Sequence, residues 1–362
     1  MNIPYPPDYG GVIDIYYKIK ALSSLGAEII LHCFQYGREQ SNELESLCRE
    51  VHYYDRDKGI KYFLSFKPYI IKTRSDQNLL RRLLDDHHPV LFEGIHTSVF
   101  ASHPDLAGKQ MILRAHNIEH EYYRGLSRIE KNLQKKAFFL SEAIKLKRYE
   151  KTLPAKLIIA AISVTDADYF RKKFREVIHL PPFHAYEKLN CQPGIGNYVL
   201  FHGDLSVSEN VASAIYLIKN IFSKISYKVV IAGKNPQPGL IKYINQFTNI
   251  RLEANPAEKE MNELICNAHI NLLHTLQPAG IKLKLISALY NGRHCIVNPE
   301  MVYGSGLDEL CYVTKDPVQT LNLIPRLMDL SLEIDEIDQR RTILYEKFSN
   351  QKNARIFLDI LE

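Results

Sequence analysis

The amino-acid sequence predicts an α/β protein with two doubly wound domains. Short apolar runs of strand length alternate with helical segments along the 362 residues. These runs are apolar throughout, which is typical of parallel strands that helices cover on both faces. At roughly 150 residues per domain, the length fits two domains. The alternation starts afresh after residue 190, as expected for a second domain.

The first half of the chain opens with a predicted helix over residues 12–25. Apolar side chains recur at helical spacing there, for example at Val12, Ile15 and Ile19. A strand-like run at residues 28–34 follows this helix. Further strands are expected at residues 90–92, 111–115 and 157–162, with helices between them.

The second half repeats the pattern more clearly. The N-terminal domain is predicted over residues 1–180, a linker over 181–196 and the C-terminal domain over 197–362. Residues 181–196 are rich in proline and glycine. Prolines oppose a helix and glycines permit turns, so this stretch is predicted to be a linker. The predicted strands of the second domain are residues 198–202, 228–232, 249–252, 270–274 and 294–297.

The first eleven residues depart from the usual order of such a domain. A doubly wound domain opens with a buried strand, then a glycine-bearing loop, then a helix. Here residues 1–11 resemble the loop itself. The first strand is therefore expected to be absent, or to lie ahead of Met1, and its loss would expose sheet edges.

Composition and charge favour some classes of function and exclude others. A net charge of +5 favours a phosphorylated ligand or an anionic membrane surface and argues against nucleic acid. Six scattered cysteines with no C-x-x-C pair indicate reduced thiols in a cytoplasmic protein. No apolar stretch is long enough to span a membrane, and no secretory signal is visible. No Asp-x-Asp motif is followed by supporting ligands at a strand end, and no dense His/Cys cluster is present, so the sequence predicts no metal site and no cofactor.

Two motifs in the first half carry functional groups. Gly10 and Gly11 precede a helix, where backbone N–H groups favour anions; a plain tight turn is the alternative. After the strand at 111–115, His116 is suited to bond a hydroxyl or move a proton, and Asn117 and Glu119 to bond a polar substrate. The alternative is that Asn117 merely caps the next helix.

The second half contains three candidate motifs. Gly203 follows a predicted strand, where it either lets a ligand approach the backbone or only permits the turn. Lys234 follows the next predicted strand, where it is either a phosphate contact or a solvated lysine. Pro278 and Gly280 mark the start of a predicted helix whose first backbone N–H groups are free for an anion. Lys282 is predicted in its first turn, where the helix dipole repels a lysine unless an anion is bound. Lys284 is expected to face elsewhere on this helix.

Residues 2–11, 114–120, 231–236 and 279–292 resemble the GT-B glycosyltransferases, specifically the family 4-like (group 1) enzymes of bacterial surface-polysaccharide clusters. The resemblance implies two Rossmann-like doubly wound domains facing a cleft, with the donor held mainly by the second. It implies no metal, because basic side chains and a helix N-terminus hold the diphosphate. The site residues that it implies are His116 and Lys282 for catalysis; Gly10, Gly11, Gly203, Lys234, Gly280, Ile281, Lys284 and Ser287 for the donor; and Asn117 and Glu119 for the sugar or acceptor.

The sequence departs from that family at two places. The family carries two glutamates, separated by seven residues, around the start of the second-domain helix. Ala279 and Ser287 stand at those positions here. The Arg/Lys pair expected after Gly203 is also replaced, by residues 204–210.

The resemblance implies retaining transfer of a hexose from a nucleoside-diphosphate sugar to a glycan or lipid-linked acceptor. Surface-polysaccharide synthesis at the inner face of the membrane, with peripheral membrane association, is the setting that it implies. The missing glutamates keep an alternative open: a catalytically weak or inactive GT-B protein that binds nucleotide or glycan in an assembly complex. A nucleotide-sugar epimerase of the same shape is a more distant alternative.

Overall fold

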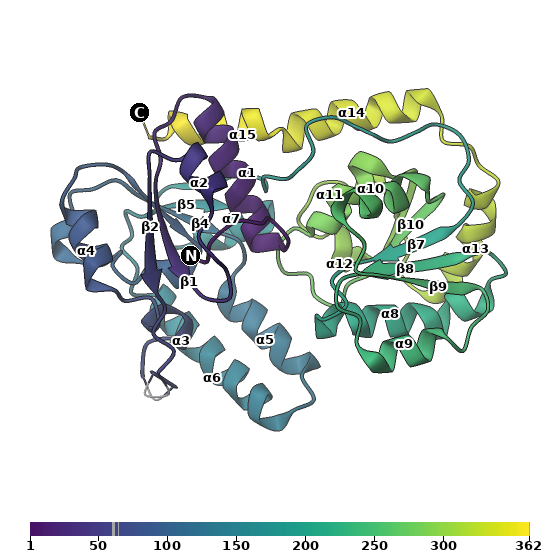
Figure 1. The fold of residues 1–362 in the computed structure, drawn as a ribbon, viewed down its shortest axis with the longest axis horizontal. Coiled ribbons are helices and arrows are strands. Elements are labelled where there is room, and N and C mark those ends of the chain that lie inside the picture. The colour runs from purple at the N-terminus through teal and green to yellow at the C-terminus, as the bar shows by residue number, and fades with distance from the viewer. Residues whose placement is uncertain (60–61, 64, 362) are drawn as a thin grey trace. The chain divides into compact units, whose positions relative to one another are not determined.

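The computed structural model describes residues 1–59, 62–63 and 65–361, and the chain divides into two compact units (Figure 1). One unit comprises Met1–Ala185 together with Phe348–Glu362, and the other comprises Tyr186–Lys347. Every strand pair in both units is parallel among the described residues. This confirms the predicted fold class of two doubly wound α/β domains.

The strands of the N-terminal unit form two separate parallel sheets. One sheet pairs β1 with β2, and the other has the order β3-β4-β5-β6. No strand of the described chain joins β1 to β3. The bounds are β1 Ile30–Gln35, β2 Glu50–Asp55, β3 Val90–Glu93, β4 Met111–Ala115, β5 Ile158–Ala161 and β6 Val177–His179.

Helices flank these sheets, and the last helix of the chain, α15, packs against the first, α1. Ala21 and Leu22 of α1 share a buried cluster with Ala354 and Phe357 of α15. Sequence analysis grouped residues 197–362 in the second domain, because the periodicity of a helix does not reveal which partner it packs against. The helices of this unit are α1 Gly10–Ser24, α2 Asn42–Leu47, α3 Tyr69–Lys72, α4 Gln77–Leu84, α5 Glu119–Ile129, α6 Leu133–Glu150, α7 Val164–Arg171 and α15 Asn350–Asp359.

The second unit contains one parallel sheet with the strand order β12-β11-β10-β7-β8-β9. The chain adds strands on one side of β7 and then crosses to its other side with β10. The carboxyl ends of β7 and β10 therefore form the topological switch point, where open α/β sheets bind ligands. The bounds are β7 Val199–His202, β8 Val229–Gly233, β9 Ile250–Ala254, β10 Ile270–Leu273, β11 His294–Val297 and β12 Tyr312–Val313.

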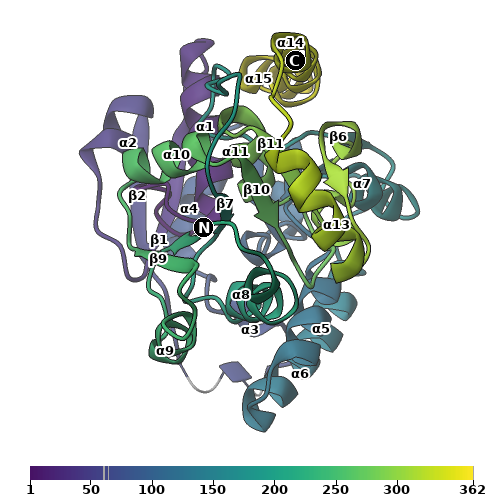
Figure 2. The same ribbon diagram turned by 90° about the vertical axis from the view of Figure 1, so that its right-hand side faces the viewer.

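Helices cover both faces of this sheet, with α8 and α9 on one side and α10 and α11 on the other (Figures 1 and 2). Alternate residues of β7 account for the two layers. Val199 and Phe201 pack toward α8 and α9, whereas Leu200 packs toward α10. The helices are α8 Ser208–Asn220, α9 Pro238–Ile244, α10 Glu258–Asn267, α11 Leu283–Asn291, α12 Pro299–Val302, α13 Pro317–Met328 and α14 Ile334–Phe348.

All of the predicted strands are present, with ends that shift by at most two residues. The structure adds β2, β6 and β12, which sequence analysis did not predict. Both β2 and β12 are edge strands with half-exposed residues. The charged residues of β2 and the two-residue length of β12 leave no apolar run that would predict a strand. The six cysteines are unpaired, as expected from their scattered positions. Among the described helices, none has both the length and the apolar character needed to cross a bilayer.

Candidate functional site

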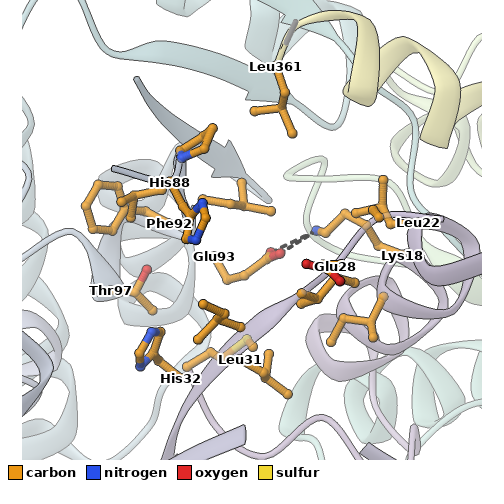
Figure 3. A pocket seen from close by; sticks show the side chains of 18 of the residues that line it. Lys18, Leu22, Glu28, Leu31, His32, His88, Phe92, Glu93, Thr97 and Leu361 are labelled. Atoms are coloured by element: carbon orange, nitrogen blue, oxygen red, sulfur yellow. Dashed lines mark hydrogen bonds and ion pairs between the residues drawn. The ribbon is translucent and has the colours of Figure 1, made fainter. Parts of the chain in front are cut away.

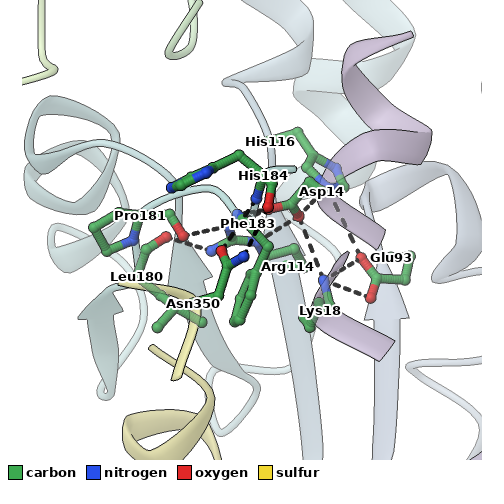
Figure 4. A network of polar contacts seen from close by, with 10 residues as sticks. All are labelled: Asp14, Lys18, Glu93, Arg114, His116, Leu180, Pro181, Phe183, His184 and Asn350. Atoms are coloured by element: carbon green, nitrogen blue, oxygen red, sulfur yellow. Dashed lines mark hydrogen bonds and ion pairs between the residues drawn. The ribbon is translucent and has the colours of Figure 1, made fainter. Parts of the chain in front are cut away.

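The N-terminal unit gathers charged side chains where β3 and β4 end beside α1. Asp14 and Lys18 lie one turn apart on the buried face of α1. Glu93 is the last residue of β3, Arg114 lies in β4, and His116 follows β4 directly. Figure 4 shows these five side chains converging on one place.

Asp14 is the centre of this cluster. Arg114 donates from Nε to Asp14 Oδ2 at 3.1 Å and from Nη2 to Oδ1 at 2.9 Å, and the N–H of Phe183 donates to Oδ1 at 2.8 Å. Burial by itself would raise the pKa of Asp14. Arg114, Lys18 and the hydrogen bond from His116 outweigh burial and hold that pKa well below its ordinary value. Asp14 is therefore an anion at neutral pH.

Lys18 and Glu93 form a second buried pair beside it. Lys18 Nζ lies 2.7 Å from Glu93 Oε1 and 3.4 Å from Asp14 Oδ2. His116 Nε2 lies 3.1 Å from Asp14 Oδ2 and 3.8 Å from Glu93 Oε2. The side chain of His116 is 13% exposed, whereas those of Asp14 and Lys18 are 1% exposed. His116 is thus the member of the cluster that reaches solvent.

The ring of His116 is oriented by its surroundings. Because Nε2 faces the carboxylate of Asp14, we assign the ring proton to Nε2, which leaves Nδ1 as the acceptor. Gly94, at φ +82°, precedes this region and makes room for the neighbouring ring of His96: a Cβ there would lie 2.6 Å from the His96 ring, but at an ordinary contact distance of 3.6 Å from His116 Nδ1. A carboxylate that orients a histidine is the arrangement used for proton transfer.

Asp14, Glu93 and His116 also form a potential donor set for a metal ion, since their ligand atoms lie within 4.8 Å of one another. The charges of the neighbours oppose this use. Lys18 and Arg114 already pair with both carboxylates, so the two positive charges balance the two negative ones. A divalent cation would have to displace or face two buried cations. The cluster does not fit a metal ion.

Glu119 and Asn117 lie next to His116, where α5 begins. Burial raises the pKa of Glu119 to about 7, against the opposing effects of His116 and of a hydrogen bond with Asn117. The N-cap of α5 is Ile118, so Asn117 does not cap the helix. A carboxyl group that changes protonation near neutral pH is a candidate acid or base.

Gly10 and Gly11 are the first two residues of α1. Both are exposed, and the N-cap residue Tyr9 provides no side-chain hydrogen bond to the helix. The N-terminus of α1 is thus exposed, about one turn before Asp14. They form the start of a helix rather than a separate tight turn.

In the second unit, the side chain of Lys284 reaches the switch point of the sheet. Lys284 Nζ donates to Asn210 Oδ1 at 3.0 Å and to the carbonyl oxygen of His274 at 3.2 Å. Burial lowers the pKa of Lys284 to about 8, although Glu209 opposes this effect. Sequence analysis placed Lys284 on another side of its helix. That expectation assumed a helix start near residue 280, whereas α11 begins at Leu283 and Lys284 lies in its first turn.

The loop after β10 is fixed to the start of α8. Glu209 accepts hydrogen bonds from Thr275 Oγ1 and, at 3.2 Å, from the N–H of Leu276. His274 stacks on Tyr216 with ring centroids 4.6 Å apart. These contacts hold the partners of Lys284 in place.

Two glycines permit the close approach of the loops after β7 and β8. A Cβ on Gly233 would lie 1.8 Å from the carbonyl oxygen of Gly203, and a Cβ on Gly203 would lie 3.1 Å from the side chain of Asn210. Gly203 therefore adjoins the Lys284 site. Lys234 is exposed just beyond β8.

Lys282 is the N-cap residue of α11, one residue before the first turn in which sequence analysis placed it. Its ammonium donates to the carbonyl oxygens of Ala279 and, at 3.1 Å, of Gly280, which adopts a φ of +65°. Ile281 is half-buried beside it. Ser287 lies farther along α11, where its Oγ is 2.7 Å from Tyr186 Oη.

Sequence analysis missed Asp14, Lys18 and Glu93 in the first unit and Glu209, Asn210 and His274 in the second. One signal for the first pair was present: Asp14 and Lys18 fall on the same stripe of the helix as Ile15 and Ile19. Charged residues on a buried stripe must be paired.

The chain matches no protein-family model. A Klebsiella pneumoniae protein named "Uncharacterized 44.6 kDa protein in cps region" is 27% identical over 316 residues, which is 80% of this chain and 79% of that protein.

Solved structures resemble nearly the whole chain. A glycosyltransferase from Rickettsia africae has a TM-score of 0.63 at 12% identity, covering 97% of this chain and 94% of its own. Anabaena HepE in complex with UDP and glucose has a TM-score of 0.65 at 11% identity, covering 100% and 97%. A Burkholderia xenovorans trehalose-phosphate synthase has a TM-score of 0.58 at 10% identity, covering 98% and 96%. These are GT-B glycosyltransferases, and the predicted GT-B fold is confirmed.

Proposed function

We propose that this chain is a glycosyltransferase that moves a hexose from a nucleoside-diphosphate sugar to a glycan or lipid-linked acceptor in surface-polysaccharide synthesis. The shared fold with HepE, which was solved with UDP and glucose, supports the donor class. The cps-region relative supports the polysaccharide setting. The observation that carries the proposal is the lysine at the switch point of the second unit.

Lys284 is suited to hold the donor diphosphate. Its hydrogen bonds go to an amide oxygen and a carbonyl oxygen, neither of which carries a full charge. Glu209 lies near enough to act on Lys284, but its carboxylate accepts hydrogen bonds from Thr275 and Leu276. A diphosphate would place negative charge directly at the ammonium group, and the N-terminus of α11 would favour the same anion. Lys282 lies at that helix start and lowers the pKa of Lys284, so the two ammonium groups act on the same region.

These lysines would also promote the reaction. Negative charge grows on the diphosphate as the bond to the sugar breaks, and cations placed in advance stabilise that charge in the transition state. In the first unit, His116 Nδ1 would bond a hydroxyl of the transferred sugar, with Asp14 fixing the ring. The resemblance to family 4-like enzymes supports retention of configuration, which NMR of the product anomer would establish.

The proposed mechanism uses no metal, because lysines take the part of a cation at the diphosphate. We expect turnover to persist in excess EDTA, with a rate within about twofold of the untreated enzyme. The control is the same assay after adding back Mg²⁺ or Mn²⁺. Activity that EDTA abolishes and the metal restores would contradict this mechanism.

Lys282→Ala is expected to weaken nucleoside-diphosphate binding by about 1–3 kcal/mol, the value of a charge-assisted hydrogen bond. Isothermal titration calorimetry measures this effect. Lys219→Ala, an exposed lysine near the end of α8, is the matched control and should bind normally. A Lys282→Ala variant with unchanged affinity but a lower Tm would show that Lys282 only bridges the carbonyls of Ala279 and Gly280.

Lys284 gives the binding a pH dependence with a definite sign. The charged form of Lys284 binds the anion, and its pKa of about 8 means that it loses this charge as pH rises through that value. Affinity for a nucleoside diphosphate should therefore be steady near pH 7 and fall between about pH 8 and pH 9.5. Lys284→Arg should remain tight across this range, because arginine stays protonated. A wild-type affinity that is flat to pH 9.5 would remove Lys284 from the phosphate site.

The decisive test combines binding with turnover. A panel of nucleotide sugars is screened by thermal shift, where a ligand at a hundred times its Kd stabilises the fold by about 2.7 kcal/mol. The donor that binds is then assayed for transfer to acceptor extracts. A protein that binds a donor and transfers no sugar to any acceptor would instead be a nucleotide-binding member of an assembly complex.

A further inference from the structure

The N-terminal unit contains a cavity of about 410 Å³ between its two sheets (Figure 3). Residues 29–32, at the start of β1, line one wall, and residues 89–93, which include β3, line the opposite wall. We call this cavity the strand slot. Helices close its two faces with apolar side chains from α1 (Ile19, Leu22), α4 (Leu79, Leu83) and α15 (Phe357, Leu358).

The strand slot lies where the parallel sheet is interrupted. β1 pairs with β2 on its outer side, and β3 pairs with β4 on its outer side. Within the described chain, no strand pairs with the inner edge of either one. Both inner edges therefore present backbone N–H and C=O groups to the cavity, and such groups require hydrogen-bond partners when buried.

The first residues of the chain show the direction of the missing strand. The N–H of Phe34 in β1 donates to the carbonyl oxygen of Met1 at 2.7 Å. Asn2 and Phe34 form an isolated parallel β-bridge. Residues 1–2 thus run alongside the carboxyl end of β1. The same line extended backward from Met1 runs beside residues 30–32 of β1. Met1 itself lines the strand slot.

The surroundings of Met1 suit a residue inside a polypeptide. Met1 is 7% exposed, and Ile3 is fully buried. Burial, with Arg74 adding to it, lowers the pKa of the Met1 amino group to about 5. A peptide N–H at this position is neutral and pairs with a neighbouring strand, so the site accommodates it better than an ammonium group.

We propose that the strand slot holds an extended apolar segment of this polypeptide, about five residues directly ahead of Met1, as a parallel strand between β1 and β3. The segment joins the two sheets into one with the order β2-β1-new strand-β3-β4-β5-β6. Its side chains are apolar on both faces, because helices cover both faces. A lipid or other apolar ligand would fill the volume and leave the edges of β1 and β3 without partners.

This strand also bears on the polar cluster of the same unit. Lys18 and Glu93 line the strand slot, and their ion pair is one side of the cluster around Asp14 (Figures 3 and 4). The proposed strand leads through residues 4–9 into α1, which carries Asp14 and Lys18. It therefore fixes α1 against β3 from within the sheet. The inference does not depend on the proposed function.

The test extends the full chain ahead of Met1 with an apolar strand-forming segment of about five residues. The matched control is a Gly/Ser extension of equal length. Amide hydrogen exchange is followed on residues 30–32 of β1 and 90–92 of β3. We expect the apolar extension to slow exchange there by about tenfold or more and to raise Tm, and the Gly/Ser extension to do neither.

Three outcomes would overturn the proposal. The first is an amide exchange rate at β1 and β3 that is the same in the apolar form as in the Gly/Ser form. The second is a concentration-dependent dimer of the unextended chain whose edges are already protected, since a second copy would then fill the slot. The third comes from mass spectrometry of the protein purified from its native cells: an N-terminal peptide that begins at Met1. An N-terminal peptide with apolar residues ahead of Met1 is the expected result.

Discussion

Replacing Asp14 by alanine should lower the free energy of unfolding of the N-terminal unit by about 3–5 kcal/mol, because the change leaves a buried charge without its partner. Arg114 is fully buried, and both of its hydrogen bonds to a carboxylate go to Asp14. The variant also removes an acceptor from Lys18, His116 and the N–H of Phe183. Unfolding in urea, monitored by amide hydrogen exchange of the residues of β4 and β5, measures the effect in this unit alone.

Asp168→Ala is the matched control. Asp168 pairs with Arg171 on the surface of α7, with side chains that are 64% and 50% exposed. Exposed pairs contribute little, so this change should cost less than about 1 kcal/mol. Equal, small effects of Asp14→Ala and Asp168→Ala would contradict the role assigned to Asp14.

The same network predicts how stability depends on pH. The pKa of Asp14 is lower in the folded state than in the unfolded chain. Its contribution is therefore complete above the unfolded value of about 4 and disappears as pH falls further, through the folded value. Wild type should lose stability in acid more steeply than Asp14→Ala does.

Sequence reasoning located the sheet strands well, because central parallel strands are short and apolar throughout. It missed β2, an edge strand that contains Glu50, His52 and Asp55, because an edge strand tolerates charged residues that a central strand does not. It also could not assign α15 to the first unit. Ala354 and Phe357 would suit any apolar surface, and only the packing against α1 identifies their partner.

The candidate site was predicted in part for a similar reason. His116 follows a strand directly, so its place at the carboxyl edge of the sheet was visible in the sequence. Asp14 lies 100 residues from Arg114, and a single sequence contains no signal that joins them. The direction of Lys284 depends on where α11 begins, and helix ends are the least certain feature of a sequence pattern.

His116→Ala should reduce turnover by about a hundredfold or more and leave nucleotide affinity nearly unchanged, because an interaction formed mainly in the transition state affects kcat rather than ground-state binding. The fold should survive this change. Asp14 keeps Arg114, Lys18 and the N–H of Phe183 as donors when the imidazole is removed. Steady-state kinetics with the donor found by thermal shift, together with calorimetry for the nucleoside diphosphate, measures both quantities.

His87→Ala is the matched control for the loss of a histidine, since His87 is exposed in the same unit. It should have normal kcat and normal Tm. If His116 were instead a packing residue, His116→Ala would lower Tm while each folded molecule kept normal activity. That result would remove His116 from the catalytic site, and the Asp14 cluster would then be a structural network that holds α1 against β4. A hundredfold loss of kcat at unchanged Tm and unchanged nucleotide affinity would place His116 on the transferred sugar. This combination shows that the chemical step is impaired while folding and donor binding are intact.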